Sequence, residues 1–177
     1  GPAAPFWGIE SEHHFDGGRH LQLVTGDILK DAVDCEVLVS SDDSELSMLG
    51  GVALRIKQAA GKEYVRQTQH LAPVMPGRVV LSGTGKLPQR FIFHAITIAE
   101  PIEHGMRRGS RGAEQRPLIA PTPDLIRGIL DDCFHHAQSL GLTSMAFPLL
   151  GTGNAGMAPD ICLRTMVDYI CRELNQG

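Results

Sequence analysis

The chain has 177 residues, of which 42% are hydrophobic and 20% charged, and its formal net charge is −4. This length suits one domain, and the composition excludes disorder, collagen and coiled coil. The negative charge excludes a broad cationic surface for nucleic acid. The sequence contains no run of about 18 apolar residues, so it predicts no membrane-spanning helix. The four scattered cysteines match no zinc motif and no signal peptide precedes them, so we expect a cytoplasmic protein with no metal and no cofactor.

Hydrophobic periodicity predicts strands at 21–25, 35–41, 78–82, 91–98 and 144–150, and helices at 52–69, 123–140 and from 159 onward. The strand at 35–41 is continuously apolar, which is typical of a central strand covered on both faces. A polar turn is expected at 42–45. The strands at 78–82 and 91–98 are close enough to form an antiparallel hairpin, whereas residues 100–123 read as a long mobile loop.

Two segments share one pattern, in which a buried strand leads into a glycine-rich turn that opens a helix. They are Gly50-Gly51 and Gly151–Gly156. Such turns let main-chain amides converge, and a helix N-terminus adds partial positive charge, so each is a candidate phosphate cradle. Because open α/β sheets bind ligands at the carboxyl ends of their strands, two such turns together predict a diphosphate ligand.

Other interpretations of these motifs fail. The second turn matches the dinucleotide fingerprint GxGxxG, but no strand and no acidic residue follow at the required distance. The segment Gly83–Lys86 lacks the glycine spacing and the Ser/Thr of an ATP-binding P-loop. A nucleic-acid role for Arg107, Arg108, Arg111 and Arg116 is not expected, because no aromatic residue lies among them.

Four ordered motifs over about residues 21–174 resemble the macrodomain, an ADP-ribose-binding module. They are Val24–Ile28, Val39–Asp43 leading to Gly50–Ala53 and Ala59–Gly61, Phe93–Ile96, and Phe147–Gly156. The resemblance implies an α/β fold, a three-layer αβα sandwich with a mixed central sheet of about six strands. It also implies that Asp27 accepts a hydrogen bond from the adenine amino group and that the two glycine turns clamp the diphosphate. A helix cap is the alternative role for Asp27.

The expected ligand-binding residues are Asp27, Ile28, Ser40, Asp43, Gly50, Gly51, Val52, Gly151, Thr152, Gly153, Asn154, Ala155, Gly156 and Met157. Departures from the family favour a binding module for ADP-ribose, or a related nucleotide, free or attached to protein. Ala53 stands where hydrolytic macrodomains have an acid, and Ile98 where another branch has a lysine. The alternative is an ADP-ribosyl or O-acetyl-ADP-ribose hydrolase in which Asp43 acts as base, although a turn cap is also open to Asp43.

Ala155 replaces an aromatic residue that often packs on the distal ribose, and the extra room suits a modified, NAD-derived signalling nucleotide as partner. We expect residues 1–18 to form an N-terminal extension, beginning with a Gly1-Pro2 tag remnant, and residues 19–177 to form one domain. The family's usual last strand is missing. Either the chain was cut from a longer protein with further domains, or a segment such as Phe6–Glu10 completes the sheet.

Overall fold

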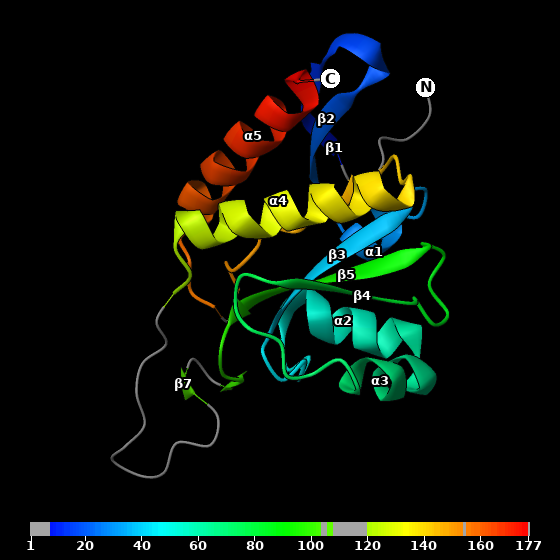
Figure 1. Ribbon diagram of the computed structural model, residues 1–177, viewed down its shortest axis with the longest axis vertical. Coiled ribbons are helices and arrows are strands. Elements are labelled where there is room, and N and C mark those ends of the chain that lie inside the picture. Colours follow the sequence, from blue (N-terminus) through cyan, green and yellow to red (C-terminus); the bar gives the residue numbers. More distant parts are fainter. Residues whose placement is uncertain (1–7, 104–105, 108–119, 154, 177) are drawn as a thin grey trace.

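The computed structural model describes residues 8–103, 106–107, 120–153 and 155–176 (Figure 1). Its elements in chain order are β1 (Gly8–His14), β2 (His20–Thr25), α1 (Ile28–Asp31), β3 (Val37–Asp43), α2 (Gly51–Ala60), α3 (Lys62–Gln69), β4 (Val79–Ser82), β5 (Phe91–Ile98), β6 (Ile102–Glu103), β7 (Met106–Arg107), α4 (Pro123–Leu140), β8 (Met145–Ala146) and α5 (Pro159–Asn175). A short 3-10 turn at Asp16–Gly18 separates β1 from β2. No helix among these elements is both long and apolar enough to cross a membrane.

The main sheet has the strand order β4-β5-β3-β8. Strand β3 runs parallel to β5 and to β8, and β4 runs antiparallel to β5, so the predicted mixed sheet and the predicted hairpin are confirmed. Within the described residues this sheet has four strands rather than about six. The segment 144–150 forms only the two-residue strand β8, because the chain turns away before Pro148, which has no amide hydrogen for a sheet.

Helices cover both faces of the sheet, as Figure 1 shows, with α4 and α5 on one face and α2 and α3 on the other. Alternation along β3 explains the two cores. Val37 and Val39 pack with α4 and α5, whereas Leu38 packs with α2 and α3, and all three are fully buried. The three-layer sandwich and the central position of this strand are therefore confirmed.

The helix boundaries follow local signals. The Thr122 hydroxyl accepts a hydrogen bond from the Leu125 amide at 3.2 Å, Pro123 opens α4, and Gly141 ends it in the left-handed conformation, as the sequence predicts. The helix expected at 52–69 is divided, because Gly61 has a φ of 99° and separates α2 from α3. The polar turn expected at 42–45 begins later, since β3 continues through Asp43.

The first strand forms from the expected N-terminal extension. Strand β1 pairs antiparallel with β2, and the proposed boundary between residues 18 and 19 falls in the turn between them. This hairpin is a sheet of its own, so in the described part of the chain no N-terminal segment completes the four-stranded sheet. Most of the loop predicted at 100–123 lies outside the described residues, which include its short β6–β7 pair.

Candidate ligand-binding site

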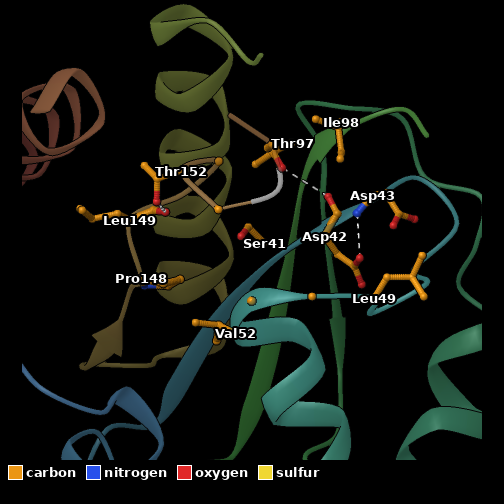
Figure 2. Close-up of a pocket in the computed structure, with 15 residues that line it drawn as sticks. Ser41, Asp42, Asp43, Leu49, Val52, Thr97, Ile98, Pro148, Leu149 and Thr152 are labelled. Carbon is orange, nitrogen blue, oxygen red and sulfur yellow. Dashed lines mark hydrogen bonds between the residues drawn. The ribbon is translucent and has the colours of Figure 1, made fainter. Parts of the chain in front are cut away.

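A cavity of about 250 Å³ lies at the carboxyl ends of β3 and β5 (Figure 2). Three segments form its walls: the end of β3 with the turn into α2, the end of β5, and the loop between β8 and α5. Both glycine turns line it, through Gly50 and Gly51 on one side and Gly151 and Gly153 on the other. The two turns thus meet at one crevice, as the strand directions predict.

The expected binding residues divide into two groups. Those that line the cavity are Asp43, Gly50, Gly51, Val52, Gly151, Thr152, Gly153 and Ala155. Those that lie elsewhere are Asp27, Ile28, Ser40, Gly156 and Met157, and Asn154 lies outside the described residues.

Strand alternation separates Ser40 from the cavity. Ser40 is 2% exposed and pairs in register with the buried His94, on the side of the sheet that α2 and α3 cover. Ser41 points to the opposite side and lines the cavity (Figure 2). The Nε2 atom of His94 lies 2.7 Å from the Ser82 hydroxyl, inside the layer between the sheet and these helices. The neighbouring Ser41, rather than Ser40, therefore faces the site.

The first glycine turn presents the start of α2 to the cavity. Gly51 has a φ of 59°, a left-handed conformation that glycine adopts without strain. Gly50 precedes the helix and has no side chain to cap it. The first amides of a helix have no carbonyl in a preceding turn, so they can donate hydrogen bonds to an anion in the cavity.

The second glycine turn is shaped by close packing. Gly151 is buried with a φ of 74°, and a Cβ at this position would lie 2.7 Å from the Pro121 side chain. Its carbonyl accepts a hydrogen bond from the Met157 amide at 2.8 Å, which closes the loop. Met157 itself belongs to the core that contains Ile126, and this explains why it does not line the cavity.

The carboxylate of Asp43 is fully engaged by the loop that follows it. Oδ1 accepts hydrogen bonds from the amides of Glu45 at 2.9 Å and Ser47 at 3.3 Å, and Oδ2 accepts one from the Ser47 hydroxyl. Asp43 is 4% exposed, and its carboxylate points away from Ser41 in Figure 2. This geometry fits the turn cap better than a base that activates water.

Asp42, which the sequence did not select as a binding residue, also lines the cavity. Its Oδ1 accepts hydrogen bonds from the amides of Asp43 at 2.8 Å and Met48 at 3.3 Å, while Oδ2 is buried with no partner among the described residues. Burial, together with the charge of Asp43, raises the pKa of Asp42 to about 7.

Asp27 caps α1, outside the walls of the cavity. Its Oδ1 accepts a hydrogen bond from the Leu29 amide at 3.0 Å and forms an ion pair with Arg55 of α2. The Arg55 guanidinium holds the pKa of Asp27 below its usual value. The neighbouring Ile28 packs against the core beneath α2. Asp27 thus acts as a helix cap in this structure, and its ion pair with Arg55 was not expected from the sequence.

Several cavity residues were not among the expected binding residues, although four of them lie within the motifs that resemble the macrodomain. Besides Ser41 and Asp42, they are Leu49, Thr97, Ile98, Pro148 and Leu149. The register of β3 against β5, which brings Asp43 opposite Ile98, places the end of β5 in the wall. A prediction that β3 and β5 are parallel neighbours would have indicated these residues, because the carboxyl ends of parallel strands meet at the same edge of the sheet.

Comparison with known proteins identifies the family. The family model described as Macro domain matches residues 39–166, which span β3 to the middle of α5. The chain belongs to the macro domain family. Two relatives, uncharacterised proteins from Aquifex aeolicus and Sulfolobus acidocaldarius, are each 31% identical to it, and the matches cover 85% and 87% of this chain and 80% and 76% of theirs.

Solved macro domains share the fold. The Oceanobacillus iheyensis macrodomain with ADP has a TM-score of 0.71 at 23% identity, covering 98% of this chain and 86% of its own. The macrodomain of Mycobacterium tuberculosis DarG has a TM-score of 0.64 at 21% identity, covering 85% and 90%. The Trypanosoma brucei macrodomain in complex with ADP-ribose has a TM-score of 0.59 at 20% identity, covering 78% and 53%.

The position of the hydrolase acid lies inside this macro domain's core. Ala53 is 3% exposed and packs with Leu38 and Ile56 beneath the cavity. Its methyl group can neither hold a water molecule nor move a proton. Ile98 lines the cavity, so no lysine amine is available at that point either.

Proposed function

We propose that this macro domain binds ADP-ribose or a related nucleotide that contains ADP-ribose, either free or attached to a protein. The observation that carries the proposal is the meeting of the two glycine turns at one cavity, between the start of α2 and the loop that holds Gly151. Glycine turns on two sides, one of them the uncapped start of α2, suit a diphosphate, which spreads its charge over several oxygen atoms. ADP and ADP-ribose are among the ligands named for solved macro domains of this fold.

Asp27 is the proposed adenine contact. The hydrogen bonds from Leu29 and Arg55 both use Oδ1 of its carboxylate, so Oδ2 remains to accept a hydrogen bond from an exocyclic amine. The Asp27 side chain is half-buried, beside α2. In this arrangement Arg55 fixes the carboxylate while Asp27 reads the purine. Ala155, 6% exposed in the cavity wall, leaves room for a larger group at the other end, as an NAD-derived nucleotide would need.

Hydrolysis has less support than binding. The oxygens of Asp43 are engaged by Glu45 and Ser47, and Ala53 supplies no acid. The function that we propose is therefore binding of ADP-ribose rather than its hydrolytic removal from proteins. Its four free cysteines support a reducing compartment such as the cytoplasm.

Calorimetry with ADP-ribose, AMP and NAD tests the proposal. We expect ADP-ribose to bind more tightly than AMP, because AMP lacks the second phosphate and the distal ribose. No heat with millimolar ADP-ribose would refute the proposal. Incubation with a mono-ADP-ribosylated protein tests the alternative, and release of ADP-ribose that Asp43→Ala abolishes would establish hydrolysis.

Substitution of Asp27 tests how the purine is held. Asp27→Ala should weaken ADP-ribose binding by about 1–3 kcal/mol, the range for losing a charged hydrogen-bond partner. Asp124→Ala is the matched control, because Asp124 also lies at the start of a helix and pairs with an arginine, Arg127, but α4 contributes no residue to the cavity, whereas Asp27 pairs with α2, whose first residues line it. Equal affinities for wild type and Asp27→Ala would show that another group recognises adenine.

A further inference from the structure

Two adjacent aspartates, Asp42 and Asp43, line the cavity, and their carboxyl groups differ in how many hydrogen-bond donors serve them. Asp42 is 8% exposed and Asp43 is 4% exposed. Three hydrogen-bond donors of the following loop serve the two oxygens of Asp43. Asp42 has donors only at Oδ1, and its Oδ2 is a buried acceptor without a partner in the described part of the chain. An unpartnered buried oxygen favours the protonated form of Asp42.

No positive charge compensates these carboxyls among the described residues. Neither takes part in any ion pair there. The titratable groups around Asp42 are Asp43 on its own strand, Glu45 in the following loop, Tyr64 on α3 and His94 on β5, while α2 presents apolar Ala53 and Ile56. That list holds no cation at neutral pH.

The two aromatic groups remain neutral between pH 6 and 8. Burial lowers the pKa of His94 to about 4, so its imidazole carries no proton charge in this range. Burial and the charge of Asp42 raise the pKa of Tyr64 well above its usual value. Asp42, whose pKa is raised to about 7 by burial and by the charge of Asp43, changes its charge in this range.

An ionised Asp42 conflicts with the ligand that the glycine turns suit. Gly51 and Val52, at the start of α2, line the same cavity as Asp42, so a diphosphate bound there and an ionised Asp42 would be like charges in a partly desolvated space. Protonation removes this repulsion and also removes the charge on the unpartnered oxygen.

We propose that Asp42 is a specificity-determining residue that must be neutral for an anionic nucleotide to occupy the cavity, so that ligand binding takes up a proton. This inference rests on the proposed binding of ADP-ribose. By linkage, protonation of Asp42 raises the affinity for the ligand by the same factor as the bound ligand raises the affinity of Asp42 for its proton. The cavity therefore discriminates against anions as the pH rises, although its amide donors do not titrate.

Calorimetry of the whole chain with ADP-ribose at pH 6, 7 and 8 tests this inference. Both phosphates of ADP-ribose are esterified, so the ligand itself does not titrate in this range. The affinity should fall by about tenfold from pH 6 to pH 8, because the neutral fraction of a carboxyl group with a pKa of about 7 falls about tenfold over this range. At pH 8, buffers with different ionisation enthalpies should report uptake of up to one proton.

Two variants separate Asp42 from its surroundings. Asp42→Asn keeps an oxygen for the two amides and should bind ADP-ribose with an affinity that does not change between pH 6 and 8. Glu45→Gln, which alters an exposed carboxyl of the same loop, should keep the pH dependence of the wild type. If Asp42→Asn fails to fold, the 13C resonance of the Asp42 carboxyl in the wild-type complex at pH 7.5 decides the matter, and it should report the protonated form.

The inference is overturned if wild-type affinity is constant from pH 6 to 8, if Asp42→Asn keeps the pH dependence, or if the 13C resonance reports an ionised carboxyl in the complex. Failure to bind ADP-ribose at every pH is a different result. It would refute the proposed function itself.

Discussion

The two glycine turns that border the cavity are held in place by different interactions. The turn after β3 is organised by side chains, because the carboxyl groups of Asp42 and Asp43 accept hydrogen bonds from the loop at Asp43–Met48. The turn after β8 is organised by backbone and packing, with Gly151 against Pro121 and closed by the Met157 amide. One turn therefore depends on charge and pH, and the other depends on the absence of a side chain.

The pH dependence of stability gives the largest expected effect. The pKa of Asp42 is about 7 in the folded protein, above its usual value of 3.8. The folded state thus binds a proton more tightly than the unfolded state. Its contribution to stability is fully present below about pH 4 and is lost as the pH rises through about 7.

Asp42→Asn removes this loss, and the unfolding free energy of the variant relative to wild type should rise by about 4 kcal/mol between pH 4 and pH 8. Urea denaturation of both proteins at several pH values measures the change. Parallel curves at every pH would mean that Asp42 does not titrate as the geometry requires.

Asp43→Ala tests the side-chain anchoring of the first turn. It should lower the free energy of unfolding by about 3 kcal/mol, because three donors lose their acceptor. Measurement at pH 5, where Asp42 is neutral, excludes relief of charge repulsion. Asp43→Asn should lose less, since its amide oxygen still accepts from Glu45 and Ser47, and equal losses in both variants would assign the effect to charge instead.

Gly151→Ala tests the second turn. The positive φ and the contact with Pro121 should together cost about 2 kcal/mol of stability and reduce ADP-ribose affinity. Gly153→Ala is the control in the same loop, because a Cβ there meets no atom of the described residues within 4 Å and its φ is not positive. Thermal melts would contradict the packing account if the two variants had the same midpoint.

The same contrast explains how much the sequence could predict. The layers, the central β3, the β4–β5 hairpin and the ends of α4 follow from periodicity and from local signals such as Thr122 and Gly141. These features depend on neighbours in the chain. Both glycine turns were also visible, because a buried strand followed by glycines and a helix is a local pattern.

Contacts between distant segments were not visible. Asp27 and Arg55 are 28 positions apart, and nothing in either neighbourhood announces their ion pair. Whether Ser40 or Ser41 lines the cavity depends on which face of β3 meets α2. Successive residues of a strand point to opposite faces, so Ser41 lines the cavity in place of the expected Ser40. Likewise, the short β8 could not be distinguished from a full strand, because 144–150 is apolar throughout most of its length.

Amide chemical shifts during a titration with ADP-ribose measure the central claim most directly, since they report which main-chain groups meet the ligand. At pH 6 the largest changes should fall on both turns, at the amides of Gly50, Gly51, Val52, Gly151, Thr152 and Gly153. Shifts confined to one turn, or located on the outer surface of α4 and α5, would contradict a cavity in which the two turns hold one diphosphate.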